Sequence, residues 1–231
     1  MLVSGGRTPR PSEISLAHNG VLFLDELPEF DRRVLEAVRE PLESSHVTIP
    51  RSMRTVSFPA RFQLIAAMNP CPCGYDGDPE LECRCSPNRI ENYTARVSGP
   101  LTERIDIHLE VARQTREVLH GGHTSEKTSA VVRERIVRTQ RRQLQRQGVL
   151  NGLLNVGVVT ARCITSRAAM KLLETATDRL ALSAHGYHKV LKMAKTIADM
   201  EEQDSIEERD IAEAVNFRSL DRNRRKIWPQ T

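Results

Sequence analysis

Val21-Leu22-Phe23-Leu24-Asp25-Glu26 is a run of four apolar residues followed directly by two acids. A continuous apolar run of this length favours a parallel-sheet strand that is buried on both faces. The carboxyl ends of such strands are where α/β sheets bind ligands. Asp25 is expected there to help hold Mg²⁺, directly or through water, and Glu26 to polarise an attacking water. A core strand that happens to end in two acids is the alternative interpretation.

Two further segments place a polar residue at one end of a predicted strand. Residues 62–68 are mostly apolar and end at Asn69, whose amide can orient a lytic water against a γ-phosphate. Asn-Pro as a simple turn is the alternative. Residues 105–111 alternate apolar and polar side chains, which predicts a third strand. Arg104 at its entrance could reach a neighbouring subunit's γ-phosphate as an arginine finger, or could form a surface salt bridge.

A helix and a hairpin are predicted between the first two strands. Asp31 can cap a helix that runs to about residue 43, with its apolar residues on one face. Residues 47–49 and 55–58 read as short strands joined by a basic tip that carries Arg51 and Arg54. This tip is a candidate for salt-sensitive contact with DNA phosphates, and a solvated hairpin is the equal alternative.

The pattern is helical from about residue 113 onward. Helices are predicted over 125–147, 166–180 and 183–200, and Ser205-x-x-Glu208 resembles a capping box for a last helix. The first of these carries six arginines that are spread around it, so a solvated helix is preferred to nucleic-acid contact. These residues are Arg133, Arg135, Arg138, Arg141, Arg142 and Arg146.

The composition is that of an ordinary folded protein. Of the 231 residues 39% are hydrophobic and 28% charged, and the net charge of +4 permits nucleic-acid contact without requiring it. No apolar run approaches the roughly 20 residues of a membrane span. We therefore expect a cytoplasmic protein with no membrane partner. Cytoplasmic thiols stay reduced, so the cysteines suggest metal binding more than disulfides.

Four of the five cysteines form the pattern C-x-C–x₉–C-x-C, and Cys163 stands alone. Four thiolates can surround one Zn²⁺ ion tetrahedrally, and two close pairs across a short loop suit that geometry. With four protein ligands and no open position, the predicted site is structural. Unliganded thiols are the alternative. The predicted ligands are Cys71, Cys73, Cys83 and Cys85.

The order of these elements is specific. An apolar strand with Asp-Glu, a basic hairpin, an apolar strand with Asn and then Leu-x-x-Arg-Ile-Asp is the order found in AAA+ ATPases. Residues 13–30, 59–70, 98–106 and 194–199 resemble the magnesium-chelatase-like (ComM/YifB) family of these motors. Members of that family also carry the cysteine insertion after the second strand.

The resemblance implies a fold, an activity and partners. The fold expected is α/β: a partial AAA+ core over residues 1–112 with a Cys-rich insertion at 71–85, a helical linker over 113–154 and an all-α lid over 155–231. The cofactors implied are ATP and Mg²⁺, bound by Asp25 and by a lid residue at position 185. The partners implied are a homo-oligomeric ring, usually a hexamer, or a full-length homologue. The family role is ATP-driven DNA remodelling, namely branch migration in natural transformation.

The sequence departs from this family in three places. No G-x-x-x-x-G-K-[ST] loop occurs in it, and the nearest imitation, residues 122–128, lacks the second glycine and follows Asp25. His185 stands where the family usually has the lid arginine, and Thr102-Glu103 replaces the more usual Leu-Asp. Without a phosphate cradle the chain alone is expected to bind ATP weakly and not to hydrolyse it.

Two other functions fit parts of the sequence. A zinc-stabilised interaction module could bind or modulate full-length homologues. An accessory of a metal-porphyrin chelatase is the third possibility, since the family is named after that enzyme. An association with a full-length homologue would favour the first of these two.

Overall fold

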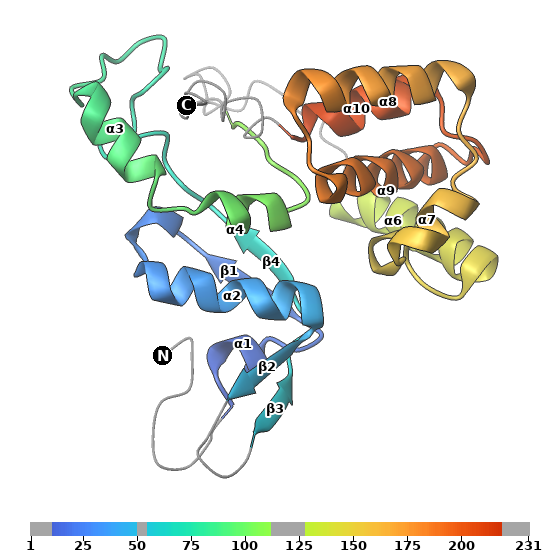
Figure 1. Cartoon of the computed structure of the whole chain (residues 1–231), viewed down its shortest axis with the longest axis horizontal. Helices are drawn as coiled ribbons and strands as arrows, with labels where there is room; N and C mark the ends of the chain where they lie inside the picture. The colour runs from blue at the N-terminus through green and yellow to red at the C-terminus, as the bar shows by residue number, and fades with distance from the viewer. Residues whose placement is uncertain (1–10, 50–54, 112–127, 219–231) are drawn as a thin grey trace. The chain divides into compact units, whose positions relative to one another are not determined.

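The computed structural model describes residues 11–49, 55–111 and 128–218, and it divides the chain into two compact units, 1–105 and 106–231. The first unit mixes strands and helices and the second is helical (Figure 1). The mixed α/β class predicted from the sequence is therefore confirmed. The hairpin tip with Arg51 and Arg54 lies outside the described residues. Within the described ranges no helix is long and apolar enough to cross a bilayer.

The first unit contains a parallel strand pair and an antiparallel hairpin. After the short helix α1 (Glu13–Leu16), β1 (Val21–Leu24) pairs in parallel with β4 (Gln63–Ala66), with Leu24 opposite Ala66. The hairpin joins β2 (His46–Ile49) to β3 (Val56–Pro59). Parallel strands need a long crossover connection, and α2 with the hairpin supplies it here.

Helix α2 (Arg32–Ser44) covers one face of the parallel pair. It begins as predicted, because the Asp31 carboxylate accepts a hydrogen bond from the Arg33 N–H at 2.7 Å. Leu35 and Val38 on its buried face share one core with Leu22 and Leu24. This core holds the carboxyl end of β1 in place, where the predicted acids follow.

The opposite face of the parallel pair carries exposed apolar side chains. Val21 is 54% exposed, Phe23 59% and Ile65 44%. The prediction that β1 is buried on both faces is therefore wrong for this structure. The described residues cover only the side of the sheet that faces the core of Leu22 and Leu24. Parallel sheets in other proteins are almost always covered on both faces.

Three short elements complete the first unit. A single 3₁₀ turn, η1 (Leu27–Glu29), follows the acids, and α3 (Pro87–Thr94) and α4 (Gly99–Arg104) follow the cysteine loop.

The strand predicted over residues 105–111 does not form. Only His108 pairs, in an isolated bridge with Arg218, and it is His108 that is buried while Ile107 and Leu109 are exposed. Among the described residues no strand pairs with that segment, so its alternation does not produce a strand.

The second unit is a helical cluster built around α9 (Ala184–Met200). Four elements contact α9, namely α6 (Ser129–Gln147), η2 (Asn151–Leu153), α7 (Val156–Arg162) and α10 (Glu208–Asn216). Helix α8 (Arg167–Leu180) packs on α10. The predicted apolar stripes of α8 and α9 form its core.

The predicted capping box at Ser205 and Glu208 is wrong by two residues. Glu207 and Asp210 form it instead, because α10 begins at Glu208.

The arginines of α6 are not spread evenly as the sequence suggested. Four of them lie on the side of α6 that faces the end of α9 and the turn after it, with N–O distances of 2.5 to 3.3 Å. The pairs are Arg135–Glu201, Arg138–Glu202, Arg142–Asp204 and Arg146–Asp199. A spacing of three or four residues places side chains on one helix face, so these arginines tie α6 to α9.

Asp199 is the centre of this network. Its side chain is 0% exposed, and its two oxygens accept hydrogen bonds from both terminal nitrogens of Arg146 at 2.5 and 2.8 Å. Asn151 donates to it at 2.8 Å, and Lys195 Nζ lies 3.4 Å away. Burial by itself would raise the pKa of Asp199, but hydrogen bonds from Arg146 and Asn151 hold that pKa below its usual value.

Replacing Asp199 with Asn is expected to lower the free energy of unfolding by roughly 3–5 kcal/mol, because the buried charge of Lys195 and the partly buried charge of Arg146 both lose their partner. Urea unfolding measures this change. Asp204→Asn is the matched control: Asp204 is exposed and pairs with Arg142, so its loss should cost at most about 1 kcal/mol. Equal losses of stability for Asp199→Asn and Asp204→Asn would contradict this account.

The stabilisation by Asp199 depends on pH. Because the folded pKa of Asp199 is depressed, its stabilisation is present above about pH 4 and is lost as the pH falls below that.

Candidate nucleotide site and metal centre

The two acids and the amide predicted from the sequence follow neighbouring strands at the same edge of the sheet. The backbone pairing continues past the strands, since the Ala67 N–H donates to the Leu24 carbonyl and the Leu27 N–H to the Ala67 carbonyl, each at 2.9 Å. Asp25 and Glu26 leave β1 here, and Asn69 leaves β4 three residues after Ala66. All three are exposed. The edge presents two carboxylates and an amide, ligands that suit Mg²⁺ and its water.

Glu26 has a left-handed backbone, with φ 51° and ψ 49°. Its N–H donates to the carboxylate of Asp25 at 2.9 Å, which orients that carboxylate at the strand end. A residue other than glycine in this conformation costs on the order of 1–3 kcal/mol, and such residues cluster at functional sites. Glu26 is one of five such residues among those described, so the conformation contributes to the site only by orienting the Asp25 carboxylate.

Helix α3 packs against the same edge. Arg96, just after the helix, pairs with Glu29 at 3.2 Å and donates to the Pro28 carbonyl at 3.3 Å. Tyr93 is buried, and burial raises its pKa. The neighbouring backbone of Asn69 acts in the opposite direction on that pKa. Sequence reasoning missed Tyr93, since nothing in the local pattern of α3 marks a buried tyrosine.

Arg104 is not displayed outward in this structure. It lies at the end of α4, where its guanidinium pairs with Glu43 of α2 at 2.6 Å and donates to the Pro100 carbonyl at 2.9 Å. Its side chain is 19% exposed. The surface salt bridge named as the alternative is thus the arrangement observed, within the first unit.

His185 belongs to the second unit, where it is exposed in the first turn of α9. Ser183 caps that helix by accepting a hydrogen bond from the Gly186 N–H at 3.2 Å.

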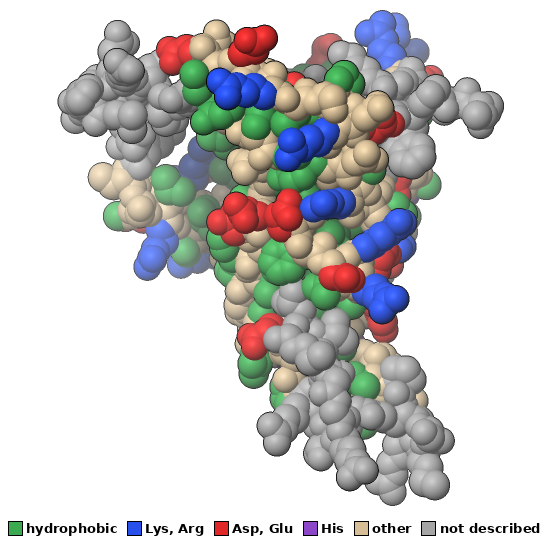
Figure 2. All heavy atoms as spheres, turned by 90° about the vertical axis from the view of Figure 1, so that its left-hand side faces the viewer, with side chains coloured by type: hydrophobic (Ala, Val, Ile, Leu, Met, Phe, Trp, Pro, Cys, Tyr) green, Lys and Arg blue, Asp and Glu red, His purple; other side chains and the backbone are tan. Residues whose placement is uncertain are grey.

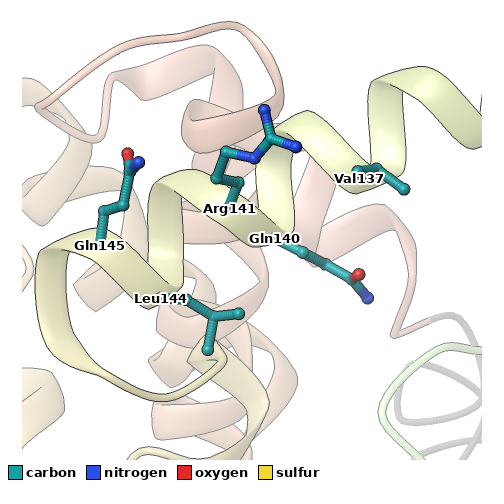
Figure 3. A pocket seen from close by; sticks show the side chains of 5 residues that line it. All are labelled: Val137, Gln140, Arg141, Leu144 and Gln145. Atoms are coloured by element: carbon teal, nitrogen blue, oxygen red, sulfur yellow. The ribbon is translucent and has the colours of Figure 1, made fainter.

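A shallow hollow of about 430 Å³ lies on α6 of the same unit, lined by Val137, Gln140, Arg141, Leu144 and Gln145 (Figure 3). None of the predicted site residues lines this hollow.

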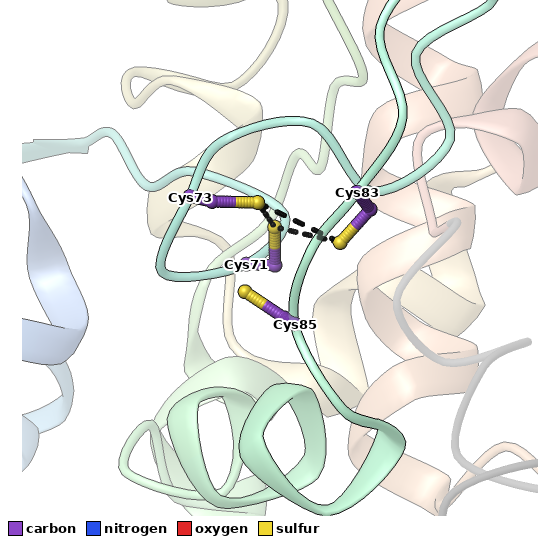
Figure 4. Close-up of side chains that lie close together, drawn as sticks. All are labelled: Cys71, Cys73, Cys83 and Cys85. Atoms are coloured by element: carbon purple, nitrogen blue, oxygen red, sulfur yellow. Dashed lines mark hydrogen bonds between the residues drawn. The ribbon is translucent and has the colours of Figure 1, made fainter.

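The four predicted cysteine ligands converge. Their sulfur atoms all lie within 4.8 Å of one another, with Cys71 fully buried and the others half-buried (Figure 4). The Sγ–Sγ distances are 3.3 Å for Cys71–Cys73, 3.6 Å for Cys73–Cys83 and 3.7 Å for Cys71–Cys83. Four sulfurs about 2.3 Å from a central ion would be about 3.8 Å apart in a regular tetrahedron. The cluster could therefore hold one metal ion with little rearrangement.

The thiols strongly influence one another's ionisation. Hydrogen bonds from the backbones of Tyr75 and Arg84 lower the pKa of Cys73 to about 6. A backbone hydrogen bond from Cys85 acts in the same direction on Cys83, but burial and the neighbouring thiols outweigh it and raise the pKa of Cys83 to about 12. The Cys73 thiol therefore ionises readily, and its negative charge opposes ionisation of the neighbouring thiols. A bound cation relieves such repulsion.

Two family models match nearly the whole chain. "Magnesium chelatase, subunit ChlI" matches residues 1–119, and "Magnesium chelatase, subunit ChlI C-terminal" matches residues 126–218. The chain belongs to the magnesium-chelatase-like family. The resemblance stated from the sequence is confirmed.

Relatives within the magnesium-chelatase-like family align over almost the entire chain. The competence protein ComM of Haemophilus influenzae is 43% identical over 227 residues, which cover 98% of this chain and 44% of that protein. YifB of Salmonella typhimurium and YifB of Escherichia coli are each 42% identical over 222 residues, covering 96% of this chain and 43% of each relative. The chain thus spans less than half the length of these relatives.

The surface of this magnesium-chelatase-like chain carries charges of both signs. Acidic and basic side chains are interspersed on the face shown in Figure 2. In the second unit, four arginines of α6 are neutralised by the acids described above. The described side chains on that face form no single basic patch.

Proposed function

We propose that this chain supplies the magnesium-binding and water-activating side of the nucleotide site in an ATP-driven motor of the AAA+ type. The parallel pairing of β1 with β4 carries the proposal, because it puts Asp25, Glu26 and Asn69 at one sheet edge. Asp25 would hold Mg²⁺, which neutralises the charge developing on the phosphates. Glu26 would polarise the attacking water and Asn69 would orient it.

The phosphates themselves need a further element. The 231 residues contain no G-x-x-x-x-G-K-[ST] sequence, whose backbone N–H groups and lysine cradle the phosphates in such motors. In this proposal, that cradle comes from polypeptide outside these residues. Arg104 would act on a neighbouring subunit's nucleotide once its pair with Glu43 opens, and His185 would contribute from α9 a weaker contact than an arginine, since histidine is mostly neutral at pH 7.

Residues 1–231 alone are expected to show no Mg²⁺-dependent ATP hydrolysis above background, because the phosphates lack their cradle. A chimaera in which these residues replace the matching segment of the Haemophilus influenzae relative is expected to hydrolyse ATP. Phosphate release measures both. Robust turnover by residues 1–231 that Glu26→Gln abolishes would disprove the need for an outside cradle. An inactive but folded chimaera would count against the motor itself.

We further propose that the motor works as a ring on DNA in the cytoplasm, in keeping with the name of the competence relative. The basic residues Arg51 and Arg54 at the tip between β2 and β3 are the candidate phosphate contacts. The metal proposed for the cysteine cluster is Zn²⁺, since four thiolates in tetrahedral array are its typical structural ligands.

The exposed face of the parallel pair favours a second candidate function. Val21, Phe23 and Ile65 form an apolar surface that suits a partner polypeptide better than water. In this alternative, the chain is a zinc-stabilised module that binds and modulates a full-length homologue. Native mass spectrometry with the Haemophilus influenzae relative distinguishes the two. A stable mixed complex that is lost in Phe23→Ser favours the module, and no complex favours the motor.

A further inference from the structure

The ion pair between Glu43 and Arg104 joins the last turn of α2 to the end of α4. We propose that Glu43 is a positioning residue that holds Arg104 against α2, and so withholds it from a neighbouring subunit's nucleotide until a phosphate takes the place of the carboxylate. The inference rests on the proposed function, in which Arg104 serves that nucleotide. It goes further by assigning control of this step to Glu43.

The packing of α4 on α2 sets the direction of the Arg104 side chain. Leu101 is 1% exposed and shares one core with Leu35 and Val38 of α2. Arg104 follows Leu101 by three residues, so the two side chains lie on the same face of α4. Burial of Leu101 therefore directs Arg104 toward α2. The ion pair is a consequence of this packing and not a chance contact between two long surface side chains.

The electrostatic surroundings of Glu43 favour a nearby cation. A negative side chain in the last turn of a helix is disfavoured by the helix dipole, and the last turn of α2, which is fully described, contains no basic side chain to offset it. Arg104 supplies that charge from α4. Its guanidinium lies 2.6 Å from the Glu43 carboxylate and also donates to the Pro100 carbonyl at 2.9 Å. In this arrangement the Arg104 side chain is only 19% exposed, so its charge is largely withdrawn from the surface.

The backbone beside Glu43 is held on both sides. Ser45, two residues further on, donates its N–H to the Pro41 carbonyl of α2 at 2.9 Å. The carbonyl of Ser45 accepts the N–H of Ala60, which follows the second strand of the hairpin, at 2.8 Å. The end of α2 is thus fixed to the hairpin. When the ion pair opens, the guanidinium of Arg104 must therefore move away, because the carboxylate is presented from a fixed position.

A phosphate can compete with Glu43 because it offers Arg104 the same kind of acceptor with more negative charge. Guanidinium groups bind carboxylates and phosphates through similar charge-assisted hydrogen bonds, often two at once. An ion pair that is partly open to water, as this one is, contributes only a small factor to an equilibrium. Glu43 therefore delays Arg104 without excluding it from the nucleotide. Removal of the carboxylate should speed the step that needs Arg104.

Single-turnover ATP hydrolysis by the chimaera tests this control. Glu43→Gln keeps the size of the side chain but removes its charge, and it should raise the rate roughly twofold to fivefold, the factor that one such pair contributes. Glu43 is 47% exposed, so the variant should fold. Glu40→Gln is the matched control, because Glu40 is exposed one turn earlier in α2, and it should leave the rate unchanged. In an Arg104→Ala background Glu43→Gln should have no effect, since the two residues act through one contact.

A second readout uses the full 231-residue chain and needs no nucleotide. Nitrogen-15 NMR measures rotation of the Arg104 guanidinium about its Nε–Cζ bond, which the ion pair slows, and Glu43→Gln should speed this rotation by a similar factor of roughly two to five. An unchanged or lower hydrolysis rate in Glu43→Gln, or unchanged rotation, would overturn the inference and leave the proposed function in place. Unimpaired hydrolysis in an Arg104→Ala chimaera would instead overturn the proposed role of Arg104, and the inference with it.

Discussion

Protein from which one zinc ion per chain has been removed is expected to lose the ordered structure of residues 71–97. Zinc bonds to four thiolates contribute on the order of 10 kcal/mol to folding in small metal sites, so the loop has no comparable source of stability once the ion is gone. Cys71→Ser, which removes the buried ligand, should reduce the zinc content from one to near zero. Inductively coupled plasma mass spectrometry of protein purified under reducing conditions measures the metal.

Cys163→Ser is the matched control for this result. Cys163 belongs to the second unit, and its pKa is raised by burial rather than by neighbouring thiols. Its replacement should leave the zinc content unchanged. Reduced wild-type protein that holds no metal after exposure to one equivalent of Zn²⁺ would end the zinc proposal. Equal losses from Cys71→Ser and Cys163→Ser would do so as well, because they would place the ion elsewhere.

Glu26→Gln is expected to reduce ATP hydrolysis by the chimaera about 10²-fold to 10⁴-fold, the usual contribution of a positioned general base. Glutamine keeps the size of the side chain and can still contact water, but it cannot accept a proton. Nucleotide binding should persist, because Asp25 and the phosphate cradle are unchanged. Steady-state phosphate release and binding of a fluorescent ATP analogue separate the two effects.

Glu40→Gln provides the same chemical change on an exposed part of α2 and should leave the rate within about twofold, since surface substitutions away from a site usually change little. Asp25→Asn should instead raise the Mg²⁺ concentration needed for half-maximal activity. If Glu26→Gln and Glu40→Gln gave the same rate, Glu26 would have no part in activating water.

Local patterns predicted the elements that position the site. Asp31 could be assigned as a helix cap because capping depends on one side chain and the backbone beside it. The strand ends at Asp25 and Asn69 could be paired because parallel strands present their carboxyl ends at one edge. The cysteine cluster followed from spacing alone, since two close pairs across a short loop can meet around one ion.

Features that depend on distant partners could not be predicted in this way. The alternation over residues 105–111 is typical of a strand, but a strand forms only where an edge accepts it. Arg104 owes its position to Glu43, which lies 61 residues away in the sequence. The arginines of α6 pair with acids more than 50 residues further on, a match that the helix alone does not indicate.

A structure of the chimaera with Mg²⁺ and a non-hydrolysable ATP analogue tests the central claim most directly. The account predicts Mg²⁺ bound by the Asp25 carboxylate at about 2.1 Å or through one intervening water, with the Asn69 amide within hydrogen-bonding distance of the γ-phosphate or of the water that attacks it. A nucleotide and ion bound away from the carboxyl ends of β1 and β4 would contradict it.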